Sequence, residues 1–296
     1  MNSFVLRSPA KLNLFLKVIN KRPDGYHNLV TLFERIDLCD DIHFCLNKKG
    51  LIRIFCNHPD VPKGPKNIVY KAAKILKEDF AVKEGVDIKI VKRIPVAAGL
   101  GGGSSNAAKT LLGLNRLWGL SLPKSILFDY AKALGSDIPF FLEDCSFALG
   151  TGRGDKLRQL DLKVKFQHIL VVPRLKVLTR EIFGAFRGAG LPIRQAGTKV
   201  LTNKGDDVNI LIRALRKNDL SQIGLLLTND LETTLVRFHP NLIKLKYIIK
   251  EYGALNASFS GSGPAAFGLV ASDVQAKTLK AFLSRQYSRV FIVRTL

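Results

Sequence analysis

The sequence has few of the residues that stabilise secreted or metal-dependent small domains. Its four cysteines form no C-x-x-C pair and share no regular spacing with the five histidines. This pattern argues against both a zinc site and a disulfide framework. We therefore expect Cys39, Cys45, Cys56 and Cys145 to be free thiols.

Long apolar segments are also missing. The uncharged segment at residues 94–108 is filled with glycine and is shorter than the roughly 20 apolar residues that a membrane-spanning helix needs. Near the start, Arg7 and Lys11 interrupt the apolar residues and no small-residue cleavage site follows, which argues against a signal peptide. We expect a cytoplasmic protein without a membrane partner.

Acidic residues are scarce: 24 Asp and Glu stand against 46 Lys and Arg, which gives a formal net charge of +22. Because such a surplus attracts polyanions, composition alone leaves a basic RNA-binding module open. The basic residues are dispersed, however, and no long basic tract with interleaved aromatics occurs. We expect the charge to serve phosphorylated small ligands and not stable nucleic-acid binding.

The patterns that are present indicate a mixed architecture. A chain of 296 residues with 47% apolar content favours two modest domains over one large core. Apolar residues alternate as in a strand at residues 12–18, and strand-like and helix-like segments then follow one another in mixed order, which predicts an α/β or α+β fold. Glycines and charges cluster at residues 149–154, so we place the domains at 1–155 and 156–296.

Local periodicity and capping signals place further elements. They predict strands at residues 86–90, 169–173 and 265–270, and helices at 68–80, 107–117, 121–134, 208–216, 242–252 and 273–285. Asn67 and Ser272 are the expected N-caps of their helices, and Gly135 is an expected helix stop. The Pro-Asp-Gly sequence within residues 21–27 predicts an exposed turn, and the basic stretch 187–207 follows no pattern.

The strongest local signal is a glycine-rich loop between a predicted strand and a predicted helix, residues 95–106, PVAAGLGGGSSN. Consecutive glycines let backbone N–H groups approach a phosphate chain, and the start of the next helix favours anions. Ser104, Ser105 and Asn106 would lie in its first turn, where side chains can add donors or reach a hydrated Mg²⁺. The loop is neither a Walker A sequence nor a dinucleotide fingerprint. We predict a phosphate cradle; the alternative is a plain strand-to-helix connector.

These residues carry a family resemblance. The loop resembles the second motif of the GHMP kinases, which include homoserine, mevalonate and galactose kinases, and SGSGPAA at residues 260–266 resembles their third motif. PAKLNLFL at 9–16, DGYH at 24–27 and LGSDIPFF at 134–141 are similar to signatures of the members that act on a diphosphocytidyl-linked polyol. The resemblance implies a two-domain fold with a ribosomal S5 domain 2-like amino-terminal half and a ferredoxin-like carboxyl-terminal half.

The resemblance also implies an activity. It is the ATP-dependent phosphorylation of the 2-hydroxyl of 4-diphosphocytidyl-2-C-methyl-D-erythritol in the non-mevalonate isoprenoid pathway, with ATP and Mg²⁺ as cofactors. A GHMP kinase for another small alcohol, such as homoserine, mevalonate or a sugar, stays open because it would share the phosphate loop. No carboxylate pair marks the Mg²⁺ ligands in the sequence. We expect a monomer or a weak homodimer that binds a small-molecule substrate.

The catalytic residues that the resemblance implies are Asp137, as the acid/base residue facing the substrate hydroxyl, and Lys11 beside it. A carboxylate can accept the hydroxyl proton, while a nearby ammonium keeps the carboxylate ionised and stabilises charge on the transferring phosphoryl group. Without the resemblance, Lys11 would be interpreted as a solvated strand lysine.

The resemblance assigns binding residues as well. Tyr26 would stack on or flank a cytosine, His27 would hydrogen-bond its edge, Phe183 would close on it, and Asn13 would bind substrate. Phe183 could equally be a core residue, and Asn67, at a family position near the adenine, could be only a helix cap. The residues expected to bind ATP are Pro95, Val96, Ala97, Ala98, Gly99, Leu100, Gly101, Gly102, Gly103, Ser104, Ser105 and Asn67. The third glycine motif comprises Ser260, Gly261, Ser262 and Gly263.

Overall fold

The computed structural model describes residues 3–188 and 206–296, which fall into two compact units. Unit 1 is formed by Met1–Lys11, Leu38–Val96 and Gly101–Asp144, and unit 2 by Leu12–Asp37, Ala97–Leu100 and Cys145–Leu296. The long strands β1 (Ser3–Lys21) and β2 (His27–Asn47) each contribute to both units, so each unit is assembled from separate segments of the chain. Most of the unpatterned stretch 187–207 lies outside the described residues.

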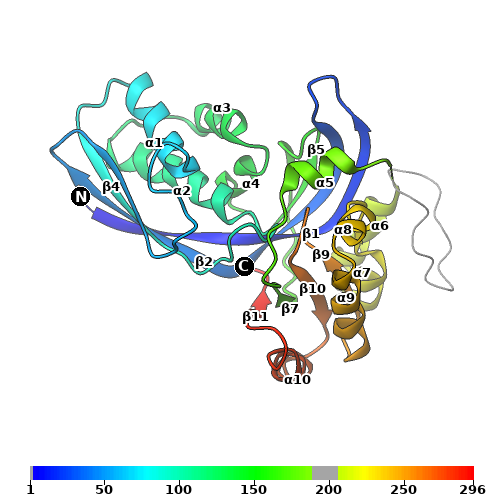
Figure 1. Cartoon of the computed structure of the whole chain (residues 1–296). Coiled ribbons are helices and arrows are strands. Elements are labelled where there is room, and N and C mark those ends of the chain that lie inside the picture. Colours follow the sequence, from blue (N-terminus) through cyan, green and yellow to red (C-terminus); the bar gives the residue numbers. More distant parts are fainter. Residues whose placement is uncertain (1–2, 189–205) are drawn as a thin grey trace. The chain divides into compact units, whose positions relative to one another are not determined.

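Unit 1 combines helices with the outer strands of a sheet. Its further elements are β3 (Ile52–Cys56), α1 (Ile68–Asp79), β4 (Gly85–Val91), α2 (Gly102–Leu117), α3 (Lys124–Leu134) and α4 (Ile138–Leu142). β4 pairs antiparallel with β2 and parallel with β3. Helices α1 to α4 pack against one another, and Figure 1 shows them gathered on one side of these strands.

The core of unit 1 depends on the buried face of α2. Ala107, Ala108, Leu111 and Leu114 are fully buried along this helix. A Cβ atom on Gly113 would lie 2.5 Å from Cζ of Phe44, closer than two carbon atoms can approach without displacement. The glycine therefore lets α2 lie directly against a ring of β2, which fixes the helix that begins in the glycine motif.

Unit 2 is built around a separate four-stranded antiparallel sheet in the order β11-β7-β10-β9. Its elements, besides its parts of β1 and β2, are β5 (Phe147–Thr151), β6 (Lys156–Leu160), β7 (Gln167–Val171), α5 (Thr179–Ala185), α6 (Asp206–Arg216), α7 (Leu220–Leu226), β8 (Thr228–Asn229), α8 (Glu232–Phe238), α9 (Asn241–Glu251), β9 (Asn256–Phe259), β10 (Ala266–Val270), α10 (Asp273–Leu283) and β11 (Val290–Arg294). Helices α9 and α10 pack on this sheet (Figure 1). They bury its apolar side chains. The hairpin β5–β6 is joined to β2 through β5.

Most elements predicted from periodicity are present. The predicted helices correspond to α1, α2, α3, α6, α9 and α10, and the predicted strands to β1, β4, β7 and β10. Asn67 accepts a hydrogen bond from the N–H of Val69 and Ser272 accepts one from that of Gln275, which confirms both N-caps. Helix α2 begins at Gly102, inside the glycine motif and earlier than predicted.

The structure bears on two features of the composition. All four cysteines are free. Among the described residues, no helix is long and apolar enough to cross a membrane.

Candidate active site

Lys11 and Asp137, the two predicted catalytic residues, lie together in unit 1. Nζ of Lys11 on β1 is 3.8 Å from Oδ2 of Asp137, at the start of α4. Lys11 is almost completely buried, whereas the Asp137 side chain is 35% exposed. Although Asp137 occupies the N-cap position of α4, its side chain makes no capping hydrogen bond. The carboxylate is therefore not used in a cap and remains beside the ammonium.

Burial changes the chemistry of this lysine. Removal from water lowers the pKa of Lys11, because burial disfavours the charged form, and the negative charge of Asp137 opposes that shift. An almost fully buried ammonium with a partly exposed carboxylate at 3.8 Å is a costly arrangement for stability alone. Titratable groups perturbed as Lys11 is are concentrated at functional sites.

The glycine motif contacts the lysine directly. Gly101, the N-cap of α2, has a φ of +68°, a left-handed conformation that glycine adopts without strain. A Cβ atom at this position would lie 3.0 Å from Cγ of Lys11 and 2.9 Å from Cζ of Phe141. The predicted phosphate cradle and the predicted catalytic pair are thus adjacent in unit 1.

The next residues of the motif divide into buried and open positions. Gly102 is buried, and a Cβ atom there would meet Ile94 and Lys92, whereas Gly103 is exposed and would meet only Ile68 at 3.9 Å. The first-turn N–H groups of a helix have no partner within the helix, so the exposed side at Gly103 is where an anion can approach.

The two serines of the loop have different environments. Ser105 is fully buried, with its hydroxyl 2.8 Å from that of Ser8, which also donates to Oδ1 of Asn106 at 2.7 Å. These side chains fix the start of α2, and the N–H of Ser105 donates to the carbonyl of Gly101 at 2.8 Å, so the hydroxyl and the N–H of Ser105 are both engaged within the protein. Ser104 is only partly buried.

Asn67 has a complete structural explanation. Its side chain accepts the N–H of Val69 at 2.9 Å and donates to the carbonyl of Pro62 at 2.6 Å. The capping interpretation is confirmed, and a contact with adenine stays a prediction.

In unit 2, the first part of the glycine loop packs on the third glycine motif. Gly99 has a φ of +79°, and a Cβ atom there would lie 2.2 Å from the carbonyl oxygen of Ser260. The buried hydroxyl of Ser260 donates to the carbonyl of Gly99 at 2.9 Å, and the N–H of Ala265 donates to that of Ala98. Two motifs more than 150 residues apart therefore share one backbone interface.

Asn13 is held near the same motif. Its amide donates to Oγ1 of Thr31 at 2.8 Å, and its Oδ1 lies 3.5 Å from Oγ of Ser260. Ser262 is linked in turn to the start of α5, since its hydroxyl lies 2.8 Å from that of Thr179. Sequence reasoning did not identify Thr31, because a strand threonine carries no signal of its own.

The predicted base-binding residues of unit 2 form an aromatic group. His27 is 8% exposed, and its ring centroid lies 5.5 Å from that of Phe183 and 6.2 Å from that of Phe186. Phe183 also packs against the core of unit 2, so the core interpretation holds alongside its position beside His27. Tyr26 is 55% exposed, with the guanidinium of Arg153 5.1 Å from its ring centre. Phe186 and Arg153 were not predicted.

The surroundings of His27 favour the neutral form of its imidazole. Burial, and secondarily the positive charge of Lys21, lower the pKa of His27 below its usual value of 6.5. A neutral imidazole presents one donor and one acceptor, the combination needed to pair with a polar heterocyclic edge.

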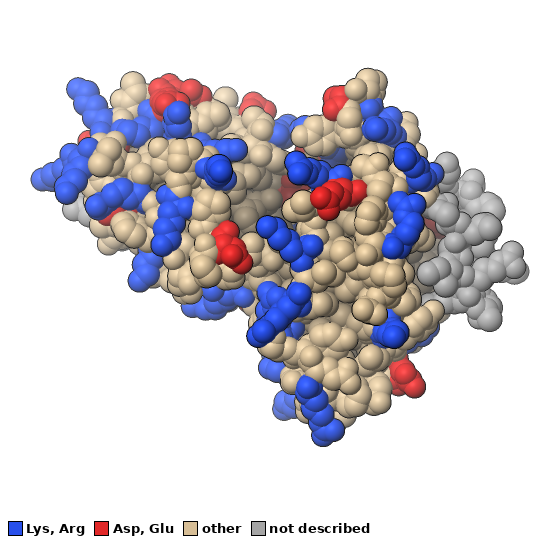
Figure 2. Space-filling view, viewed as in Figure 1, with Lys and Arg blue, Asp and Glu red and all other residues tan. Residues whose placement is uncertain are grey.

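The basic surplus does not gather at one place on the face shown in Figure 2. Lys and Arg side chains are scattered there over the described residues, with a few acidic groups between them. This matches the dispersion of basic residues in the sequence.

Comparisons with known proteins agree with this geometry. The family model for the GHMP kinases N terminal domain matches residues 67–144, and that for the GHMP kinases C terminal matches residues 211–289. The 4-diphosphocytidyl-2-C-methyl-D-erythritol kinase of Pelotomaculum thermopropionicum is 37% identical over 286 residues, covering 97% of this chain and 96% of the relative.

Solved structures give the same result. A crystal structure of 4-(cytidine 5'-diphospho)-2C-methyl-D-erythritol kinase matches with a TM-score of 0.80 and 31% identity, covering 99% of this chain and all of the other. Homoserine kinase from Cytophaga hutchinsonii, at 20% identity, covers all of this chain and 95% of its own with a TM-score of 0.75, and so shares the fold. The predicted two-domain α/β fold is confirmed. The chain belongs to the GHMP kinase family, as these relatives do, and it is an ATP-dependent small-molecule kinase.

Proposed function

We propose that this kinase transfers the γ-phosphoryl group of ATP to the 2-hydroxyl of 4-diphosphocytidyl-2-C-methyl-D-erythritol in the non-mevalonate isoprenoid pathway. The observation that carries the proposal is the buried ammonium of Lys11, 3.8 Å from the carboxylate of Asp137, on a side chain whose Cγ packs against Gly101, the N-cap of α2. The names of full-length relatives at 36–38% identity supply the substrate.

The transfer needs no covalent enzyme intermediate. Asp137 accepts the proton of the 2-hydroxyl, and the resulting oxygen nucleophile attacks the γ-phosphorus as the bond to the ADP oxygen breaks. Lys11 stabilises the charge on the transferring group, and the N–H groups at the start of α2 bind the phosphate chain. Pro95 to Ser105 line this chain of phosphates, with Asn67 on the adenine side.

Mg²⁺ fits the donors available around α2. The ion prefers oxygen ligands and usually keeps several waters and substrate phosphates in its shell. The Ser104 hydroxyl, partly exposed at the start of α2, and the Asp137 carboxylate are oxygen donors of this type. Mg²⁺ would neutralise charge on the transferred phosphoryl group.

For the cytosine of the substrate, we assign the aromatic group of unit 2. Neutral His27 can pair with the base edge, which itself offers a donor and an acceptor, while Tyr26 and Phe183 offer flat faces. Asn13, held by Thr31, would orient the polyol.

The remaining expectations belong to the same proposal. We assign residues 1–155 to the nucleotide-binding domain and 156–296 to the substrate-side domain. The protein would work in the cytoplasm as a monomer or weak homodimer.

A panel assay tests this function. ATP turnover is measured with the cytidine substrate, homoserine, mevalonate and galactose, and the phosphorylated product is located by ³¹P NMR. We expect activity with the cytidine substrate alone and phosphorylation at its 2-oxygen. Preferential turnover of another alcohol would overturn the substrate assignment while leaving the kinase assignment intact.

A further inference from the structure

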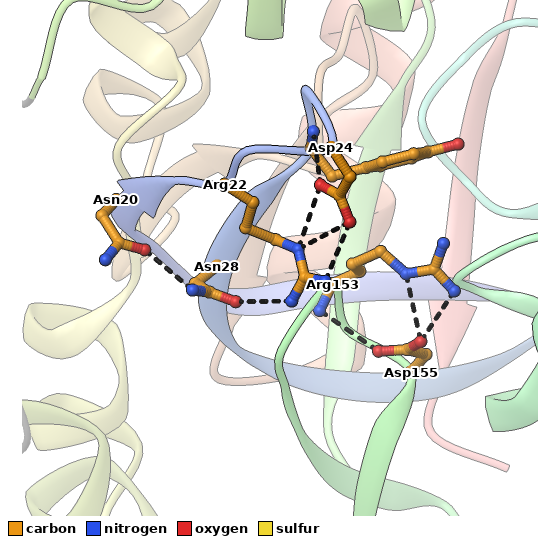
Figure 3. Close-up of polar contacts among 7 residues, drawn as sticks. Asn20, Arg22, Asp24, Asn28, Arg153 and Asp155 are labelled. Carbon is orange, nitrogen blue, oxygen red and sulfur yellow. Dashed lines mark hydrogen bonds and ion pairs between the residues drawn. The ribbon is translucent and has the colours of Figure 1, made fainter.

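Two turns of unit 2 carry a charged network that the reaction does not explain. One turn joins β1 to β2 and contains Tyr26; the other joins β5 to β6 and contains Arg153 and Asp155 (Figure 3). The strands β2 and β5 pair, and the N–H of Leu29 donates to the carbonyl of Gly152 at 2.7 Å. The two turns are therefore held side by side.

The first turn is fixed by its own side chains. Nε and Nη2 of Arg22 donate to the carboxylate of Asp24 at 2.8–3.1 Å, and Nη1 donates to Oδ1 of Asn28. The amide of Asn28 donates to Asn20, and Asp24 also accepts the backbone N–H of Tyr26 (Figure 3). This arrangement fixes the backbone at Tyr26 but leaves its ring, which is 55% exposed, unsupported by the apolar core.

The second turn supplies that support. Nε and Nη2 of Arg153 donate to Oδ2 of Asp155 at 3.2 and 2.9 Å, and its N–H donates to Oδ1 at 3.1 Å. The carbon of the guanidinium lies 5.1 Å from the centre of the Tyr26 ring, within the range of a cation–π contact. Burial would raise the pKa of Asp155, but the hydrogen bond and charge of Arg153 outweigh it and lower this pKa, so the pair stays ionised.

We propose that Arg153 is a positioning residue for base recognition, which orients the Tyr26 ring so that a cytosine can stack on it. The guanidinium is held by Asp155, and it covers one face of an exposed ring whose opposite face is then presented in a single orientation. The Arg22–Asp24 pair is largely exposed, and exposed ion pairs contribute little to stability, so stability alone gives weak reason for that part of the network. The inference rests on the proposed function, because it takes the base to be a cytosine.

The first test distinguishes an effect on binding of the cytidine substrate from an effect on binding of ATP. Arg153→Met keeps most of the apolar stem and removes the guanidinium, while Arg158→Met removes an exposed positive charge from the neighbouring strand β6 as a control. CDP binding is measured by calorimetry, and KM and kcat are measured for both substrates. We expect about a three- to tenfold loss of CDP affinity and a matching rise in KM for the cytidine substrate in Arg153→Met. kcat and KM for ATP should not change, and Arg158→Met should match the wild type.

A double-mutant cycle tests whether the effect passes through the ring. Tyr26→Leu should weaken CDP binding, and adding Arg153→Met to it should cause no further loss, because coupled residues are not additive. Additive losses would overturn the positioning role, since Arg153 would then act independently of Tyr26. Unchanged CDP binding in folded Arg153→Met, or an equal change in KM for ATP, would also overturn it. If wild-type protein neither binds CDP nor turns over the cytidine substrate, the proposed function itself fails.

Discussion

Lys11 is the residue at which function and stability make opposite demands. Burial lowers the pKa of Lys11 in the folded state from its usual value of 10.5. The folded state therefore binds the proton of Lys11 more weakly than the unfolded chain does. Protonated Lys11 therefore reduces the free energy of unfolding at neutral pH. Asp137, whose side chain is 35% exposed, would remain solvated without its partner.

We accordingly predict that Lys11→Met abolishes most activity without lowering thermal stability. Methionine has a similar length and removes the buried charge, so the melting temperature should be unchanged or higher. kcat should fall because the transferring phosphoryl group loses a cation. A thermal melt alongside steady-state kinetics checks both, and a lower melting temperature with normal kcat would contradict the argument.

Asp137→Asn should have a different profile. Because the side chain makes no capping bond, asparagine should leave the melting temperature and ATP binding nearly unchanged. Asparagine cannot accept the hydroxyl proton, so kcat should fall by about two to four orders of magnitude. Asp129→Asn, at a side chain that is 74% exposed on α3, is the control and should be silent. Near-normal turnover in Asp137→Asn would remove the general-base assignment.

Substitutions at two neighbouring glycines, Gly102 and Gly103, test whether the glycine-rich loop is a phosphate cradle or a plain connector. At Gly103 an added Cβ atom meets nothing closer than 3.9 Å, and alanine favours helix, so Gly103→Ala should preserve or raise the melting temperature. ATP affinity should nevertheless fall, because the methyl group occupies the side that phosphates approach. Gly102→Ala should instead destabilise the protein by pressing on Ile94 and Lys92. Unchanged ATP affinity in Gly103→Ala, measured by nucleotide titration, would favour the connector.

At the scale of elements, sequence patterns located what is local. Asn67 and Ser272 were identifiable as caps because a capping bond spans only two or three residues. The start of α2 was predicted too late because its first residues are glycines and serines, which have low helix propensity. Periodicity detects a helix only where apolar residues repeat.

Contacts between distant segments could not be predicted in the same way. Residues 8–16 of β1 are all buried, so both faces of the strand are covered although its apolar residues alternate. The neighbours Ser8 and Ser105, Thr31 and Asn13, and Arg153 and Tyr26 are brought together by strand pairing and helix packing, which leave no spacing signal. Lys11 and Asp137 were identified only through a family resemblance.

The contact between the two glycine motifs yields a prediction at this scale. At Gly99 an alanine would have to adopt a φ of +79° and place Cβ 2.2 Å from a backbone oxygen of Ser260. We expect Gly99→Ala to reduce the free energy of unfolding by about 1–3 kcal/mol, as strained backbone substitutions do. Gly119→Ala, at a φ of +63° where nothing lies within 4 Å, is the matched control, because it has similar backbone strain without the contact. Equal melting temperatures for the two variants would show that the motifs can separate freely.

For the whole molecule, the unexplained property is its charge of +22. Both proposed substrates are anions, and a positive field raises the rate at which anions arrive without requiring a contiguous patch. A nucleic-acid partner, by contrast, needs basic groups aligned with a backbone and aromatic faces for bases. The scattered Lys and Arg side chains in Figure 2 favour the first use on the face shown there.

Salt dependence distinguishes these uses. If the charge speeds capture of anionic substrates, kcat/KM should fall steadily with ionic strength, whereas kcat should change little because bound substrate no longer depends on long-range attraction. At physiological ionic strength, where the screening length is about 8 Å, a gel-shift titration with RNA should show no saturable sub-micromolar complex. Sodium chloride is varied with Mg²⁺ held constant, so that screening and metal supply are not confused. Tight, saturable RNA binding, together with a kcat/KM that does not change with ionic strength, would assign the charge to a nucleic-acid partner.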